Sequence, residues 1–486
     1  MSGRSFGARV IRGLLFKLME RGSVLIVSLG VSILLARLLD TSDYSMIAMV
    51  NIVLEIVNVF VNYGLSAALI HHSGADQEDM STCFWGSLIF GVLLYGVVFV
   101  LAGPLAAFFR EPALKMILRV MGVQLIFTMV HSVQVAIISK RFQYARLFWV
   151  TLASSAASGV VGVVMALKGC GVWALVAQSM CGIMLPTVLT GFVLRWKPDR
   201  SFSLARLKGQ IAYSWRLLIS GFVDCLYAEI RSVIIARISP ADLAFYNKGT
   251  QFPKLISNTV NQSVISVLFP SFSVIQSERE RLVVYLRRTV SGLTVVILPV
   301  LCGLAAVAED FVLLLLTEKW LPCAAYMQIL CLAYMITPVQ SVFKQALKAL
   351  GRTRSLLMTN AVEKGVGLVL LLLAVPRGIG AICWSFVMYH VVGLAGYMLV
   401  VRHAAGYCLR DQLRDVLPAV GASAVMTACV LLAGRLPLGT GALLAVEVLA
   451  GAAVYTVLML LIPNEMRNLL FRKLCPARRG HAASEE

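Results

Sequence analysis

The chain has 486 residues, of which 59% are hydrophobic and only 14% are charged, and its formal net charge is +19. Because soluble proteins carry about 25% charged residues, this composition excludes a soluble globular protein and predicts an integral membrane protein. The basic residues lie mostly in short loops between apolar segments and form no dense aromatic-rich run, so nucleic acid is excluded as a partner.

The first residues, 1–20, mix basic and apolar side chains. Arg9, Arg12 and Lys17 alternate with Val10 and Leu14, a pattern typical of a basic amphipathic helix on a membrane surface. The apolar run that follows lacks a small-residue cleavage site, so we expect a retained span and not a signal peptide.

Apolar segments of about 20 residues predict membrane-spanning helices. Before the basic stretch at 195–208 the candidates are 22–39, 44–70, 83–103, 113–139, 147–167 and 171–194. After it the candidates are 211–237, 249–270, 289–308, 321–343, 355–375, 378–401, 415–434 and 438–462. The fold class predicted by these fourteen segments is an all-α integral membrane protein.

The distribution of Lys and Arg predicts the orientation of these spans. An excess of basic residues marks cytoplasmic loops, and it is largest if both termini are cytoplasmic. One loop departs from the rule, because 71–82 contains Asp76, Glu78 and Asp79 but no Lys or Arg.

A weak internal repeat divides the spans. Ala36-Arg37 at the end of the first span is matched by Ala236-Arg237 at the end of the seventh, an offset of 200 residues. Such parallel repeats are common in transporters. We therefore predict two six-helix lobes, 21–205 and 206–403, around a central cavity, then two peripheral helices at 404–465 and a basic cytoplasmic tail at 466–486.

Charged and amide residues inside the spans follow helical spacing. In the seventh span Arg216, Asp224 and Arg231 fall on one side of the helix, and Glu229 faces elsewhere. Similar in-span residues are Glu55, Arg119, Lys254, Asn258, Asn261, Glu363 and Lys364. Because a charge at membrane depth costs at least about 2.5–3.5 kcal/mol, it normally faces a bundle interior or a wet cavity. The alternative is that these residues only hold helices together.

Motifs for metal or cofactor chemistry are missing from the sequence. The eleven cysteines form no CxxC pair, the six histidines form no HExxH motif, and there is no P-loop. We therefore expect no metal, no cofactor and no enzymatic activity, with His131 and His390 as hydrogen-bonded core residues.

Several segments carry a resemblance to a known family. They are 36–50 (ARLLDTSDYSMIAMV), 64–70 (GLSAALI), 81–95 (STCFWGSLIFGVLLY), 140–147 (KRFQYARL), 169–176 (GCGVWALV), 195–204 (RWKPDRSFSL), 269–276 (FPSFSVIQ) and 317–320 (TEKW). In order and spacing the chain resembles the Wzx-type polysaccharide transporters, in the superfamily of the lipid II flippase and the multidrug and toxin extruders. The resemblance implies a flippase that moves undecaprenyl-pyrophosphate-linked oligosaccharide across the bacterial inner membrane by alternating access, for lipopolysaccharide, exopolysaccharide or capsule synthesis.

The in-span residues then receive roles. For contact with the pyrophosphate or glycan we select Arg119, Arg216, Arg231, Lys254, Lys364, Asn258 and Asn261, since Arg presents a planar fork to phosphate oxygens. For ion coupling or charge pairing we select Glu55, Asp224, Glu229 and Glu363. Membrane lipid, a polysaccharide polymerase and a chain-length regulator are the expected partners. A monomer is compatible with the sequence, which does not determine the oligomeric state.

Two other functions stay open. A multidrug exporter of the same superfamily would need a dominant acidic pocket, to which the first span contributes no acid. A membrane-embedded glycan polymerase or ligase would need a catalytic acid or base on a substantial outer loop, and the predicted outer loops are short.

Overall fold

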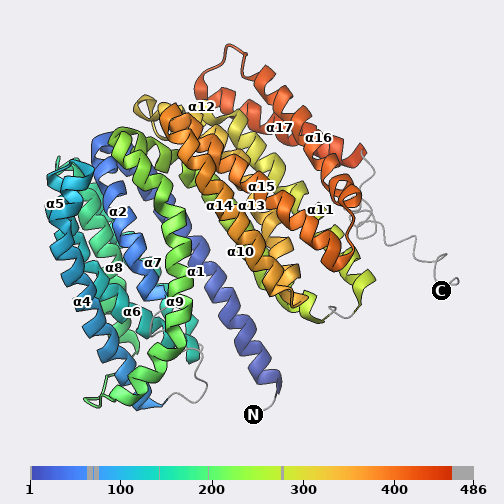
Figure 1. Cartoon of the computed structure of the whole chain (residues 1–486). Helices are drawn as coiled ribbons and strands as arrows, with labels where there is room; N and C mark the ends of the chain where they lie inside the picture. The colour runs from blue at the N-terminus through green and yellow to red at the C-terminus, as the bar shows by residue number, and fades with distance from the viewer. Residues whose placement is uncertain are drawn as a thin grey trace. The chain divides into compact units, whose positions relative to one another are not determined.

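The computed structural model describes residues 3–62, 69, 76–141, 143–194, 196–274 and 278–461. Of residues 3–18, 62, 210–214, 216, 217, 263, 266, 267, 269, 270, 273 and 274 it describes the backbone alone. Within these ranges all regular structure is helical, as Figure 1 shows. The basic tail expected at 466–486 lies outside the described residues.

The chain forms two compact units, Met1–Ala244 and Phe245–Glu486. The helices of the first unit are α1 (Gly3–Leu38), α2 (Thr41–Asn62), α4 (Gln77–Phe109), α5 (Ala113–Gly122), α6 (Gln124–Lys140), α7 (Tyr144–Leu167), α8 (Val172–Leu194) and α9 (Leu204–Ile238). Because α9 packs against α2 and α4, it belongs to the first unit. The lobe boundary expected near 205 comes from the sequence repeat, whereas the boundary at 244 comes from packing.

The second unit contains the remaining helices, except for the first five residues of α10, which belong to the first unit. They are α10 (Pro240–Val274), α11 (Arg279–Ala306), α12 (Ala308–Leu315), α13 (Pro322–Ala349), α14 (Thr353–Ala374), α15 (Ile379–Ala405), α16 (Leu409–Ala433) and α17 (Thr440–Leu461), with short 3₁₀ turns at Glu318–Trp320 and Val375–Arg377.

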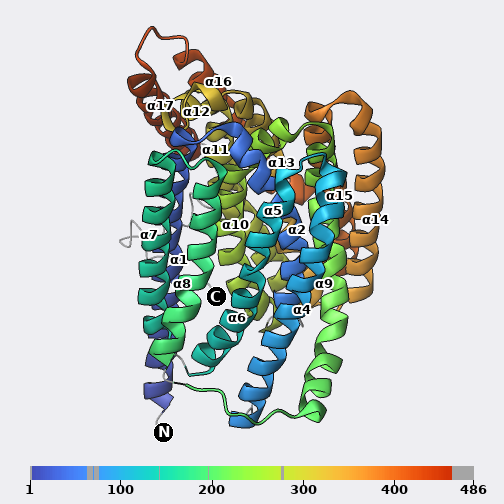
Figure 2. The ribbon, with the colours of Figure 1, turned by 90° about the vertical axis from the view of Figure 1, so that its left-hand side faces the viewer.

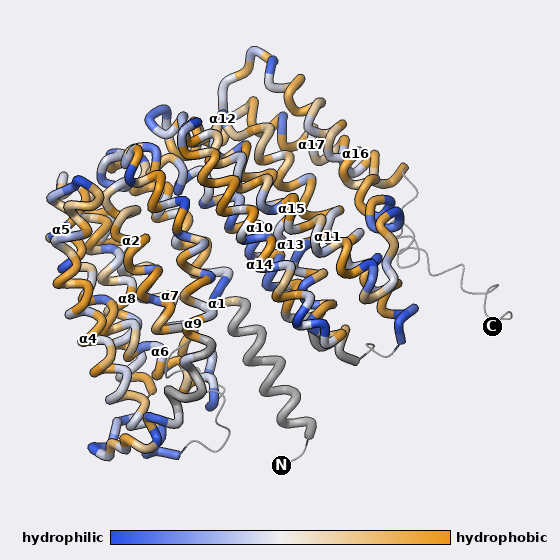
Figure 3. The backbone as a smooth tube through the Cα atoms, in the orientation of Figure 1, coloured by the Kyte–Doolittle hydropathy of each residue, from blue (hydrophilic) through white to orange (hydrophobic). Residues whose placement is uncertain are grey.

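Twelve helices in the described part of the chain are long and apolar enough to cross a membrane. In Figure 3 hydrophobic residues dominate the lengths of most of these helices, and many hydrophilic ones lie near helix ends. The other two expected spans correspond to α9 and α10, each of 35 residues, which are not among the twelve. That α9 and α10 cross the membrane stays a prediction.

The structure adds detail to two of the expected elements. The segment 3–20 is helical, but its helix continues without a break into the first span as α1. The span expected at 113–139 is confirmed as the candidate span Ala113–Lys140. Within it the N–H of Val123 donates to the carbonyl of Val120, which tightens one turn between α5 and α6.

Close helix packing in the first unit depends on a small residue in α7. Figure 2 shows α1, α7 and α8 side by side. A Cβ atom added at Gly159 of α7 would lie 2.4 Å from Val31 Cγ2 of α1. Glycine therefore allows the two backbones to approach, as small residues commonly do between membrane helices.

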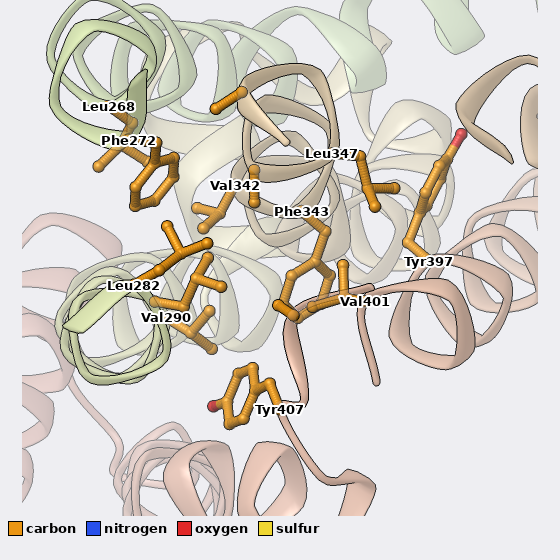
Figure 4. Close-up of a cluster of buried hydrophobic side chains, with 14 of the residues drawn as sticks. Leu268, Phe272, Leu282, Val290, Val342, Phe343, Leu347, Tyr397, Val401 and Tyr407 are labelled. Atoms are coloured by element: carbon orange, nitrogen blue, oxygen red, sulfur yellow. The ribbon is translucent and has the colours of Figure 1, made fainter. Parts of the chain in front are cut away.

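The second unit has a continuous apolar core. Figure 4 shows Phe272 of α10, Leu282 of α11, Phe343 of α13 and Val401 of α15 around a common centre. At its edge Arg287 of α11 binds the Asp415 carboxylate of α16 through two nitrogens, each 2.9 Å from an oxygen. This bidentate pair holds α16 against α11.

The acidic residues that departed from the charge rule lie at the start of α4 and bind a basic residue of α9. Arg206 is 2.7 Å from Asp76, 2.8 Å from Glu78 and 2.9 Å from Asp79. Asp76 also caps α4 by accepting a hydrogen bond from the Asp79 backbone N–H at 2.8 Å. This bond, followed by that from Arg206, lowers the pKa of Asp76 to about 2. The loop that lacks Lys and Arg is thus paired with an arginine from a segment far away in the sequence.

Candidate functional site

A buried polar cluster joins three helices of the second unit. Gln340 and Lys344 lie on α13, Glu363 on α14, and His390 and Tyr397 on α15. Gln340, Glu363 and Tyr397 are each at most 2% exposed. Burying a polar group is costly unless the group is hydrogen-bonded. We therefore describe the hydrogen-bond partners of each side chain in the cluster.

The Glu363 carboxylate is the centre of this cluster. Its Oε2 accepts a hydrogen bond from the Tyr397 hydroxyl at 2.8 Å and lies 3.8 Å from Lys344 Nζ. Its Oε1 accepts a hydrogen bond from Gln340 Nε2 at 3.3 Å. Tyr397 also contacts the side-chain oxygen of Asn360, and the Lys344 ammonium lies 4.8 Å from the centre of the Tyr397 ring. The carboxylate is therefore compensated by a cation and by two hydrogen-bond donors.

His390 is tied to the same cluster through Gln340. Its Nδ1 lies 3.2 Å from Gln340 Oε1, and its backbone carbonyl accepts from Gln340 Nε2 at 2.8 Å. This agrees with the expectation of a hydrogen-bonded core histidine.

Gly393 of α15 makes room for the carboxylate. A Cβ atom there would lie 2.2 Å from Glu363 Oε1 and 2.7 Å from Gln340 Nε2. The cluster thus depends on a close approach of α15 to α14, where any larger side chain would displace Glu363.

The polar residues of α10 divide between a packed and an exposed side. Ser257 is fully buried, and its hydroxyl donates to the Tyr334 carbonyl of α13 at 2.9 Å. Lys254 and Asn258 are exposed and lie one turn apart on the same side of the helix. Asn261 is half-buried, and its side-chain oxygen has no hydrogen-bond partner in the described part of the chain. Near mid-length, α10 therefore presents a polar surface that does not pack within its unit.

The charged residues that were predicted in the seventh span lie on α9 and differ in their exposure to solvent. Asp224 is exposed and Glu229 is half-buried, whereas Arg231 is only 3% exposed. The Arg231 guanidinium lies 5.4 Å from the centre of the Tyr227 ring, with one nitrogen 3.5 Å from the Tyr227 hydroxyl. Arg231 is thus held within the first unit while Asp224 faces outward from it.

The other selected residues of the first unit lie on three helices. Glu55 of α2 is exposed, and its carbonyl lies 3.6 Å from Cys225 Sγ of α9. Arg119 of α5 is half-buried and lies 4.1 Å from the centre of the Phe99 ring. Arg216 lies in α9, but its side chain is outside the described residues.

The selected residues are therefore only partly brought together. Glu363 joins a cluster, with Lys344 as its nearest cation, and Lys364 on the same helix is half-buried. The expectation that all selected residues face one cavity stays a prediction. Gln340 and Tyr397 were missed, although they lie four residues before Lys344 and seven after His390, at helical spacings that could have indicated them. Among the described residues no group of three or more His, Cys, Asp or Glu side chains could hold a metal ion.

The fold defines the class of protein. The structure superposes on the lipid II flippase MurJ in an inward closed conformation with a TM-score of 0.74, covering 95% of this chain and 99% of that one. The sequence identity is 12%, so this likeness concerns the fold alone. With twelve candidate spans in its described part, the chain is an all-α multi-pass membrane protein with the fold of MurJ.

The sequence comparisons identify the family. The model of the polysaccharide biosynthesis protein family matches residues 34–325, more than half of the chain, so the protein belongs to this family of Wzx-like flippases. It is 25% identical to the succinoglycan biosynthesis transport protein ExoT of Rhizobium meliloti, over 92% of this chain and 91% of that protein. It is 23% identical to the lipopolysaccharide biosynthesis protein WzxC of Escherichia coli, over 68% of each chain. The family expected from the sequence is confirmed.

Proposed function

We propose that this protein is a flippase for undecaprenyl-pyrophosphate-linked oligosaccharide units. It moves them from the cytoplasmic to the periplasmic leaflet of the bacterial inner membrane during surface polysaccharide synthesis. The similarity to transport proteins of succinoglycan and lipopolysaccharide synthesis supports this substrate class. Both termini are cytoplasmic in this proposal.

The exposed polar surface of α10 is the observation that carries the proposal. Lys254 and Asn258 are exposed in the middle of a helix of 35 residues. A charged side chain facing lipid at this depth is costly, so we place this surface against water. A pyrophosphate and a glycan are too polar to cross hydrocarbon and need such a hydrated surface.

The basic residues are assigned to substrate contact. Lys254, Arg231 and Lys364 supply positive charge on three helices, and cations form strong charge-assisted hydrogen bonds to pyrophosphate oxygens. Arg119 and Arg216 have the same assignment, with Asn258 and Asn261 for glycan hydroxyls. Alternating access between two states exposes the substrate to one leaflet at a time.

The acidic residues are assigned to pairing or to ion coupling. Contact between Glu363 and Lys344 supports pairing for Glu363. Glu55 and Asp224 are exposed and so accessible to a cation, while Glu229 is half-buried. A polysaccharide polymerase and a chain-length regulator are the proposed partners downstream.

The test uses a deletion strain complemented with variants at normal protein level. Lys254→Ala and Arg231→Ala are each expected to leave the protein in the membrane but to reduce surface polysaccharide at least tenfold, with lipid-linked glycan accumulating on the cytoplasmic face. Arg281→Ala is the control, because Arg281 is an exposed residue paired with Glu278 near a helix start.

Unchanged export in both variants would refute the site assignment. A deletion strain that displays single glycan units outside would indicate a polymerase, and one whose main defect is drug susceptibility would indicate a multidrug exporter. Arg231 is buried, so its variant is informative only if it is inserted at normal level. Lys254 is exposed, which makes its variant the stricter test.

A further inference from the structure

A pocket in the first unit is unrelated to the in-span polar residues. Its volume is about 310 Å³, and its walls are Trp85 and Ile89 of α4 together with Arg200 and Phe202 of the segment at 196–203. Trp85 and Ile89 lie four residues apart and so share one face of α4. The pocket thus combines three apolar side chains with that of one arginine.

The segment that forms half of the pocket is fixed to α4 by hydrogen bonds. Trp196 Nε1 donates to Gln77 Oε1 at 2.7 Å, and the Asp199 N–H donates to Ser81 Oγ at 3.0 Å. The indole N–H of Trp85 donates to the Asp199 carbonyl at 2.8 Å. These bonds orient the Trp85 ring and hold the segment in place, so the pocket is already formed without a ligand.

Arg200 is available for an anion. In the described part of the chain no acidic side chain pairs with Arg200, whereas Arg206, six residues later, is bound by three carboxylates. An arginine against apolar walls can donate two parallel hydrogen bonds to a phosphate. The contrast between the two arginines shows that the acidic residues here are committed to Arg206.

The position of the pocket along α4 indicates that it lies at a membrane interface. Trp85 lies eight residues after the start of α4, about 12 Å along the helix axis. The 33 residues of α4 extend about 50 Å, roughly 20 Å more than the hydrocarbon thickness. Trp85 also forms an edge-to-face contact with Phe84, which contacts Trp196 in the same way. Such aromatic groups are enriched where headgroups meet acyl chains.

We infer that this pocket binds an anionic glycerophospholipid of the cytoplasmic leaflet. Arg200 receives the phosphate, while Trp85, Ile89 and Phe202 contact the glycerol and the first acyl carbons. A volume of about 310 Å³ is at the small end of ligand sites and admits a headgroup but not an oligosaccharide. Basic residues near this surface attract anionic lipids of that leaflet. The bound lipid stabilises the segment that connects α8 to α9.

The experiment measures lipid binding by the full chain purified in detergent. Phosphatidylglycerol and phosphatidylcholine are titrated while the thermal unfolding midpoint is recorded. Phosphatidylglycerol is expected to raise the midpoint more than phosphatidylcholine does. Arg200→Gln is expected to weaken the apparent phosphatidylglycerol affinity about tenfold, the effect of losing a charge-assisted hydrogen bond.

Lys208→Gln is the matched control, because it removes the same charge from an exposed position near the start of α9. Phe202→Ala, which removes a 40% exposed apolar wall, is expected to weaken binding without any change of charge. An equal loss in Lys208→Gln, or no loss in Arg200→Gln, would overturn the inference. So would stabilisation by inorganic phosphate that matches that of the lipid, because the acyl chain would then contribute nothing.

Discussion

Lys344 Nζ lies 3.8 Å from Glu363 Oε2 and thereby links α13 to α14. The Glu363 side chain is 2% exposed and that of Lys344 is 30% exposed. The Glu363 carboxylate also accepts a hydrogen bond from the Tyr397 hydroxyl of α15. Its contacts therefore connect α13, α14 and α15. This pair can be tested by removing each partner.

Lys344→Met is expected to lower the free energy of unfolding by about 1–3 kcal/mol, because it leaves a buried carboxylate without its cation. Solvent screening of the partly exposed lysine favours the lower end of this range. The double variant Lys344→Met with Glu363→Gln is expected to lose less than the sum of the single variants, by about 1 kcal/mol. Thermal unfolding in detergent measures all three, and strict additivity would contradict a direct interaction.

Gly393→Ala is expected to destabilise the second unit by about 1–3 kcal/mol, the usual effect of overpacking. The added Cβ would lie 2.2 Å from Glu363 Oε1, so the carboxylate has to move away from Gln340. The control is Gly365→Ala on α14, where nothing lies within 4 Å of the new Cβ. It is expected to be neutral or stabilising, since alanine has the higher helix propensity. Equal unfolding midpoints for the two variants would show that Gly393 is not required for the cluster.

Asn258→Cys is expected to react with a membrane-impermeant maleimide in intact membranes, because the polar side of α10 faces water in the proposed function. Leu372→Cys on α14 is the control, since Leu372 is 59% exposed on an apolar helix and is expected to face lipid. Labelling is measured over that of the parent protein with its exposed Cys408 changed to serine. Labelling at 372 and not at 258 would place the polar side of α10 away from water.

Loss of the Arg206 contacts is expected to release the segment at 196–203. The pKa of Asp76 is lowered to about 2 in the folded protein from an ordinary value of 3.8. Its contribution to stability is therefore present above about pH 3.8 and is lost as the pH falls through about 2. Pepsin cleavage within the segment should be faster in Arg206→Ala than in the parent at pH 4, and the ratio of the two rates should be smaller at pH 2, where about half of the Asp76 carboxylates are protonated.

A ratio of rates that does not change between pH 4 and pH 2 would show that Asp76 does not hold Arg206. The matched control is Lys208→Ala, which removes a basic residue from an exposed position near the start of α9 and leaves the three acids bound to Arg206 in place. It is expected to cleave at the rate of the parent at both pH values.

Hydropathy and helical spacing were sufficient to predict an all-α membrane protein. A stretch of apolar residues long enough to cross a bilayer is a local property, so the helices could be predicted in order from the sequence. The order and spacing of eight short segments indicated the family. The tightened turn between α5 and α6 could not be predicted, because it depends on one hydrogen bond of Val123 that no residue type nearby requires.

The sequence by itself determined that this is a helical membrane transporter with charged residues inside its spans, since composition and periodicity act within each segment. Only the tertiary structure decided which charged side chains form pairs and which are buried. Asp76 and Arg206 lie 130 residues apart in the chain, and Arg231 is buried while Asp224 on the same helix is exposed. Pairing between distant segments depends on how helices pack against one another, and that packing is set by side-chain shape over the whole unit.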